Sequence, residues 1–338
     1  MDIIWQLGIQ IVLFLQGMGA WLIEPMKLFT FLGNEEFYLF VAPAIFWCLD
    51  MDLGLRLGLF LMLSGSLNTI IKIAFHGPRP YWIDTHVKAY STEISFGVPS
   101  GHSQNAVVVW GTLAAWLQKA WAWVVAVALI FLIGLSRMYL GVHFPHDVLL
   151  GWGIGALLLW ILLIIEVPLT NWLHNFRPTQ QILIAFGASI LMVLLGVLVR
   201  SVLGNWSMPE EWMQNAFLAS PTSDSPEPLG LSGLISNAAV FFGLACGGIW
   251  IKSRGGFEAR GPAWQRLVRF LIGLIGVGIL WYGLGAIFPR GESLLPFALR
   301  YIRYALIGLW ITAFAPILFI QLKLAVKRRP QGKPTEAL

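Results

Sequence analysis

Long apolar runs separated by short polar segments make up most of the chain between residues 36 and 325. A helix that crosses the hydrocarbon core of a bilayer needs roughly 20 mostly apolar residues. Runs near this length predict nine membrane-spanning helices, at residues 36–50, 53–75, 102–118, 120–140, 147–167, 181–203, 232–252, 264–288 and 300–325. We therefore expect an all-α fold, a polytopic membrane bundle of about nine transmembrane helices.

Residues 3–30 are also apolar, but they do not fit the same pattern of spans. They contain no cleavage-site pattern, so a removed signal peptide is not expected. The segment predicts a helix that lies in the membrane interface or packs on the bundle. A tenth membrane-spanning helix is the alternative interpretation.

The composition fits a membrane protein, since 57% of the 338 residues are hydrophobic and only 12% are charged. The net charge of +5 does not indicate nucleic-acid binding, because many of the cations fall in loops that flank the spans. Cys48 and Cys246 lie inside apolar runs, where small buried hydrophobic side chains are expected. Neither has the spacing of a metal site or a disulfide framework.

The distribution of charged residues predicts the orientation of the spans. Basic residues are concentrated at 252–269 (Lys252, Arg254, Arg260, Arg266 and Arg269) and in the tail (Lys323, Lys327, Arg328, Arg329 and Lys333). Segment 204–231 contains four acidic residues and no Lys or Arg. Because Lys and Arg accumulate in cytoplasmic loops, we expect 252–269 and the C-terminus inside and 204–231 outside. Counting spans backwards places segments 76–101 and 136–147 outside as well.

Three polar clusters interrupt the apolar sequence on this outer face. They are Lys72 with Arg79-Pro80, then Pro99-Ser100-Gly101-His102, then Ser136-Arg137 with His143 and Asp147. Ionisable groups near a bilayer are costly and usually mark a functional site. The clusters therefore predict one site built from three separate segments.

The cations of these clusters indicate a site for phosphate. A phosphoryl group stays anionic through its transfer, so catalysis depends on positioning and on fixed positive charge. Lys72, Arg79 and Arg137 can supply that charge, with the Arg side chains offering a planar fork of donors. Lys and Arg at helix ends also extend to lipid headgroups, which is the ordinary alternative for any one of them.

The second cluster resembles the start of a helix that binds an anion. Ser100 suits an N-cap, and Gly101 allows the backbone to approach a ligand closely. The free N–H groups of a helix N-terminus attract anions. A plain capped helix is the alternative, but an imidazole at His102 could also reach the oxygen of a leaving group.

The third cluster indicates a nucleophile. His143 precedes the predicted 147–167 span, and Asp147 follows four residues later, within reach of the near ring nitrogen. A carboxylate on one nitrogen fixes the tautomer and increases the nucleophilicity of the other. A structural His–Asp hydrogen bond is the alternative. His76, His86 and His146 have no carboxylate at a spacing that indicates such a pair, and they are interpreted as loop histidines.

Metal ligation finds no support in the sequence. We find no H-E-x-x-H pattern, no series of carboxylates and no Cys pair. We therefore expect no metal and no other cofactor.

Together, these residues resemble the three-part signature of the type 2 phosphatidic acid phosphatase and vanadium-dependent haloperoxidase superfamily. The resemblance implies that Lys72, Arg79 and Arg137 bind phosphate and that Ser100 and Gly101 donate hydrogen bonds to it. It also implies that His102 protonates the leaving group and that His143, oriented by Asp147, forms a phosphohistidine. This core covers roughly 36–167, which suggests three parts: 1–35 (an interfacial or packing helix), 36–167 (the catalytic core) and 168–338 (a transmembrane extension).

Over its whole length, the chain is similar to glucose-6-phosphatase catalytic subunits, through HGPRPYW after Lys72 and SRMYLGVHFPH in the third cluster. Those enzymes carry Gln at the position of Asp147. The lipid phosphatases of the superfamily carry Asp there, as this chain does. The terminal KPTEAL lacks a dilysine retrieval signal. Both features favour a bacterial plasma membrane over the endoplasmic reticulum.

The sequence thus predicts an integral-membrane, metal-independent phosphatase that acts on the extracytoplasmic face. Its expected partners are the lipid bilayer and a phosphorylated lipid or small molecule, with no nucleic acid and with the oligomeric state left open. A lipid or isoprenoid phosphate is favoured as substrate, a sugar phosphate is the alternative, and phosphoryl transfer to an alcohol stays open. Haloperoxidases of this superfamily are soluble, unlike this chain. A transporter or scaffold would not need both His102 and His143.

Overall fold

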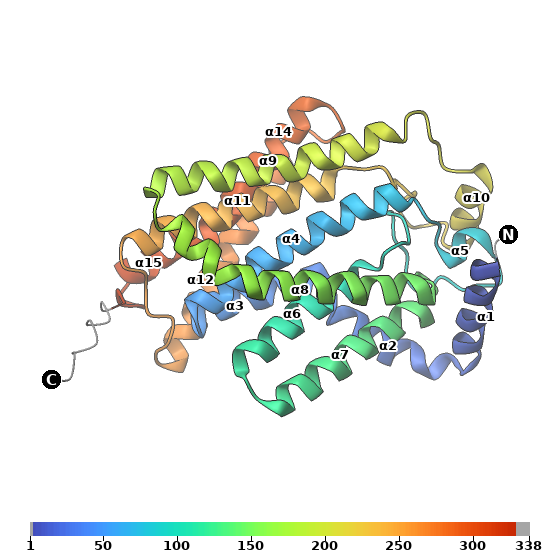
Figure 1. Ribbon diagram of the computed structural model, residues 1–338, viewed down its shortest axis with the longest axis horizontal. Helices are drawn as coiled ribbons and strands as arrows, with labels where there is room; N and C mark the ends of the chain where they lie inside the picture. Colours follow the sequence, from blue (N-terminus) through green and yellow to red (C-terminus); the bar gives the residue numbers. More distant parts are fainter. Residues whose placement is uncertain (1–2, 329–338) are drawn as a thin grey trace. The chain divides into compact units, whose positions relative to one another are not determined.

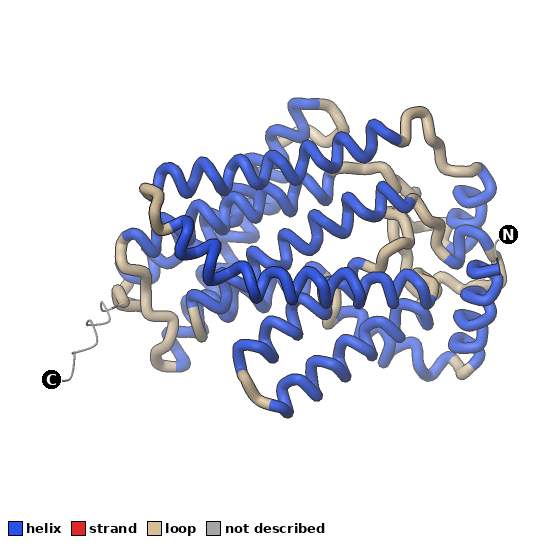
Figure 2. The backbone as a smooth tube through the Cα atoms, in the orientation of Figure 1, coloured by secondary structure: helices blue, strands red, loops and turns tan. Residues whose placement is uncertain are grey.

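The computed structural model describes residues 3–328, and these residues are entirely helical apart from their connecting loops (Figure 2). Within this range, strand-like pairing is limited to one antiparallel bridge between Phe257 and Lys327. The expected all-α fold is confirmed. Arg329, Lys333 and the terminal KPTEAL lie outside the described residues.

Fifteen α-helices follow one another along the described chain (Figure 1). Their bounds are α1 Ile3–Gly17, α2 Ile23–Phe31, α3 Glu35–Cys48, α4 Met51–Phe75, α5 Pro80–Ile83, α6 Gly101–Leu117, α7 Ala120–Tyr139, α8 Pro145–Leu173, α9 Pro178–Val202, α10 Glu210–Ala219, α11 Ser232–Ser253, α12 Ala263–Gly278, α13 Leu284–Ile287, α14 Leu294–Leu309 and α15 Ala315–Gln321. Short π-helical segments at Ile279–Gly283 and Trp310–Phe314 join α12 to α13 and α14 to α15.

Seven helical segments of the described chain are long and apolar enough to cross a membrane. The chain is therefore an integral membrane protein, but the number of nine spans is not confirmed. Helices do form at all nine expected positions, yet α3 has 14 residues and α6 has 17. Both are shorter than a full span, and polar residues stand in their first turns: Glu35 and Glu36 in α3, His102 and Gln104 in α6.

The N-terminal segment forms two helical pieces rather than one straight span. The piece that contains α1 meets the piece that contains α2 at 91°. The bend falls beside Gly19, whose φ of +114° is readily accessible to glycine. Helix α1 contacts α5 and α7, and α2 contacts α7, so this segment packs on the helices that follow it.

Contacts divide the chain into two compact units. The first comprises the residues up to Leu39, Phe60–Asn171 and Ile190–Ala238; the second comprises Phe40–Leu59, Trp172–Ser189 and the residues from Ala239 on. Every candidate site residue lies in the first unit. There α1 and α10 both pack against α5, over a buried cluster that includes Trp82, Phe96 and Phe144. The division into 1–35, 36–167 and 168–338 stays a prediction.

Candidate active site

The three polar clusters meet at one cavity of about 530 Å³ in the first unit. Six of the eight residues that the sequence singled out line it: Lys72, Arg79, Gly101, His102, Arg137 and His143. Ser100 and Asp147 are completely buried next to these residues, so they support the lining without forming it. Segments up to 71 residues apart thus converge, as the clustering of costly polar groups predicts.

Arg79 makes more hydrogen bonds than either of the other two cations. It precedes the short helix α5 and is completely buried. Its Nε donates to the Ser95 carbonyl at 2.7 Å, Nη2 to the Phe96 carbonyl at 2.9 Å and Nη1 to the Val142 carbonyl at 2.8 Å. With further contacts to the Ser95 hydroxyl and to His143, this network engages all five N–H donors and fixes the guanidinium plane.

His143 lies between a cation and a carboxylate. Its Nδ1 is 3.2 Å from Asp147 Oδ2, which also accepts from the Phe144 N–H at 2.9 Å. On the other side, Arg79 Nη1 is 3.3 Å from His143 Nε2. Because the carboxylate only accepts, Nδ1 carries the proton and Nε2 presents its lone pair. Asp147 comes from the first turn of α8, which Pro145 begins.

The charge state of His143 suits a nucleophile. Burial lowers the pKa of its imidazole well below the usual value, and the charges of Arg79 and Lys72 lower it further. The ring is therefore neutral near pH 7, and its Nε2 lone pair, which accepts from Arg79 Nη1, faces the cavity cations. The interpretation of His146 as a loop residue is wrong, because it lies in the first turn of α8, and its Nε2 is 3.2 Å from Asp147 Oδ1.

Helix α6 begins as the sequence predicts. Ser100 is its N-cap, and the Ser100 hydroxyl accepts from the Ser103 N–H at 3.4 Å. A Cβ at Gly101 would lie 2.9 Å from Asn68 Oδ1, so only glycine fits without displacing Asn68. His102, in the first turn, places Nε2 2.6 Å from Asn34 Oδ1.

The loop before α6 supplies acceptors to all three cations. Lys72 donates to the Phe96 carbonyl, and Arg137 pairs with the Glu93 carboxylate. Burial alone would raise the pKa of Glu93, but the charges of Arg137 and then Arg79 hold it at about 2. Glu93 is therefore an anion across the neutral range, paired with the guanidinium of Arg137.

Sequence reasoning missed three residues that contact the site: Thr30, Asn34 and Glu93. Arg137 Nη1 donates to the Thr30 hydroxyl, and Asn34 meets His102. Glu93 carried a signal, since it is one of few charges in a loop between two of the clusters. Thr30 and Asn34 carried none, because they lie in a segment interpreted only as a membrane-associated helix.

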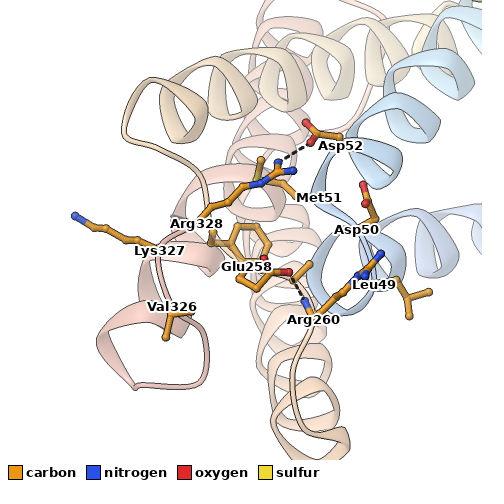
Figure 3. A pocket seen from close by; sticks show the side chains of 11 residues that line it. Leu49, Asp50, Met51, Asp52, Glu258, Arg260, Val326, Lys327 and Arg328 are labelled. Carbon is orange, nitrogen blue, oxygen red and sulfur yellow. Dashed lines mark hydrogen bonds and ion pairs between the residues drawn. The ribbon is translucent and has the colours of Figure 1, made fainter. Parts of the chain in front are cut away.

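Among residues 3–328, no three His, Cys, Asp or Glu side chains gather as a metal site would require. Metal independence stays a prediction for assay. A second cavity of about 590 Å³, in the second unit, is lined by residues from 49–52, 257–260 and 326–328 (Figure 3). There Asp52 pairs with Arg328 at 2.8 Å and with Lys252 at 2.6 Å. It contains no histidine and none of the candidate residues, so it does not compete with the first as an active site.

Matches to known families and relatives show that the chain is a membrane phosphatase of the PAP2 superfamily. Residues 53–171 match the PAP2 superfamily, and residues 235–328 match the PAP2 superfamily phosphatase transmembrane extension. The chain is 33% identical over 155 residues to phosphatidylglycerophosphatase B of Bacillus subtilis (strain 168), covering 42% of this chain and 73% of that protein.

Similarity to sugar phosphatases extends over more of the chain. Glucose-6-phosphatase 3 of Bos taurus is 28% identical over 257 residues, which cover 66% of this chain and 73% of the relative. Glucose-6-phosphatase 2 of Homo sapiens is 24% identical over 354 residues, covering 94% of this chain and 96% of the relative. The resemblance stated from the sequence is thus confirmed at the level of the superfamily.

Proposed function

We propose that this chain hydrolyses a phosphomonoester through a phosphohistidine formed on His143. The observation that carries the proposal is the placement of a buried imidazole between Asp147 and Arg79. Nε2 attacks phosphorus and forms the N–P bond, while the P–O bond to the alcohol breaks. His102, which the charge of the bound phosphate dianion keeps protonated, gives its proton to the departing oxygen. Water, deprotonated by His102, then attacks phosphorus and releases inorganic phosphate and His143.

The remaining candidate residues bind the phosphoryl group in this proposal. Lys72, Arg79 and Arg137 hold its three non-bridging oxygens, and their fixed charge stabilises the transition state. The N–H groups at the start of α6, near Ser100 and Gly101, contribute further donors. Before it can bind Arg137, the incoming phosphate must replace or rearrange the Glu93 contact.

The cavity lining favours a hydroxyl-rich leaving group. Among its 26 lining residues, the larger apolar side chains are limited to Ile73, Ile94 and Pro228. The other lining residues are glycines or have polar or charged side chains, for example Asn34, Asn68 and Asn105. Polar side chains of this kind can bind the hydroxyl groups of a sugar as well as a phosphate. This observation favours the sugar-phosphate alternative over the lipid phosphate that the sequence favoured.

The purified protein in detergent is expected to release inorganic phosphate from p-nitrophenyl phosphate and from a sugar phosphate. Activity should be complete in excess chelator, and vanadate should inhibit it, because vanadate adopts the geometry of the phosphoryl transition state. A panel of sugar, prenyl and lipid phosphates, assayed for inorganic phosphate, tests the substrate class. Phosphorylated alcohol in place of inorganic phosphate would indicate a phosphotransferase. Activity that is lost in EDTA and restored by a divalent cation would contradict metal independence.

We further propose that the site opens on the extracytoplasmic face, in a bacterial plasma membrane. The support is the absence of Lys and Arg from 204–231 and their accumulation at 252–269. In a variant without Cys48 and Cys246, single cysteines replace Lys88, Ser225 or Ser253. A membrane-impermeant maleimide should label positions 88 and 225 in intact cells and position 253 only after permeabilisation. Labelling of 88 and 225 on opposite faces would refute the topology.

A further inference from the structure

The turn between α2 and α3 is in direct contact with the candidate active site. Hydrogen bonds from the Gly33 N–H to the Thr30 carbonyl at 2.9 Å and from the Asn34 N–H to the Phe31 carbonyl at 3.1 Å fold the turn. The Asn34 carbonyl accepts from the Tyr38 N–H at 3.3 Å, in the first turn of α3. Asn34 is therefore fixed by its backbone on both sides, and its side chain reaches the cavity.

This turn is packed closely against His102. A Cβ at Gly33 would lie 2.7 Å from Ile133 Cγ2 and 3.4 Å from His102 Cδ2, so there is no room for a larger residue without movement. Next to it, Asn34 Oδ1 is 2.6 Å from His102 Nε2. One turn earlier, the Thr30 hydroxyl accepts from Arg137. The end of α2 and the turn that follows it thus contact both the candidate acid and Arg137.

We propose that Asn34 is a positioning residue for the general acid, holding the His102 imidazole by its Nε2–H. This inference rests on the proposed function of the site. With Nε2–H bonded to the amide oxygen, Nδ1 is the nitrogen that gives its proton to the leaving-group oxygen. Asn34 itself forms and breaks no bond in the reaction.

The chemistry of the two histidine partners matches the two roles. His143 has a carboxylate, which favours the charged imidazolium that attack on phosphorus produces. His102 has a neutral amide, which orients the ring but stabilises its cationic form less than a carboxylate would. An acid with an amide partner gives up its proton more readily. The two partners therefore favour different protonation states. Asp147 favours the imidazolium of His143 that forms on attack, whereas Asn34 lets His102 release its proton.

The test compares kcat on a phosphate ester of an alkyl alcohol with kcat on p-nitrophenyl phosphate. An alkoxide needs the acid's proton as it leaves, whereas p-nitrophenolate does not. Asn34→Ala should lower kcat on the alkyl phosphate at least about tenfold and change kcat on p-nitrophenyl phosphate less than about threefold. In a His102→Ala background, Asn34→Ala should have no further effect on the alkyl phosphate, because the two residues act as a unit.

Asn215→Ala is a matched control in the same unit. Its Nδ2 donates to the Trp82 carbonyl at 2.9 Å, and it does not line the cavity. It should affect both substrates equally. Equal losses for Asn34→Ala on both substrates, no loss on either, or a full additional loss in the His102→Ala background would each overturn the positioning role. Wild-type protein that hydrolyses neither substrate would instead refute the proposed function, so the two failures are distinguishable.

Discussion

Replacing His143 with alanine is expected to abolish turnover on every phosphomonoester, with kcat reduced by at least about a thousandfold. A loss of this size corresponds to about 4 kcal/mol of barrier. The reason is that the N–P bond cannot form, and no other neutral imidazole lies between Arg79 and a carboxylate among the described residues. The measurement is kcat on p-nitrophenyl phosphate and on an alkyl phosphate, with identical losses expected because attack on phosphorus is common to both.

The matched control for this variant is His86→Ala. His86 also pairs with an aspartate, since its Nδ1 lies 2.8 Å from Asp84 Oδ1, but its side chain is 84% exposed and does not line the cavity. It should keep wild-type activity. A His143→Ala protein that unfolds with the wild-type midpoint yet retains more than about a tenth of the wild-type rate, a loss of only about 1.4 kcal/mol, would rule out His143 as the nucleophile.

The three polar clusters could be predicted from the sequence because ionisable residues are rare in apolar segments, where burying their charge costs free energy. Lys72, Arg79 and Arg137 stand in apolar surroundings, and an ionised group there requires a partner or a function. The spacing of His143 and Asp147 likewise predicts contact, because the residue before a helix and one in its first turn are close together. Short-range geometry and solvation were enough to place these residues, even with soft helix boundaries.

The contacts that complete the site could not be predicted in this way. Asn34 meets His102 across 68 residues, and Thr30 meets Arg137 across 107. Neither threonine nor asparagine is costly at a helix end, so nothing in the local pattern sets them apart. The count of nine spans is not confirmed, and α6 shows why such a count is hard to predict. Polar site residues occupy the first turns of α6, and a helix that carries them is left short of a full apolar length.

Replacing His102 with alanine is expected to separate substrates by their leaving groups. General acid catalysis typically contributes about a hundredfold to ten-thousandfold, and it does so only where the leaving oxygen needs a proton. His102→Ala should therefore lose at least about a hundredfold in kcat on an alkyl or sugar phosphate and far less on p-nitrophenyl phosphate. A series of aryl phosphates gives the measurement, since log kcat should fall more steeply with leaving-group pKa in the variant than in the wild type.

The slope of that series distinguishes an acid from a residue that only positions phosphate. His102 lines the same cavity as Arg137, so its loss could weaken phosphate binding, which would lower the rate for all esters by one common factor. A common factor shifts the line without changing its slope, whereas a missing proton steepens it. His143→Ala, measured with the same series wherever turnover remains detectable, should shift every ester without this selectivity. Parallel lines for His102→Ala and wild type would remove the acid from the mechanism and leave its proton to be supplied by solvent.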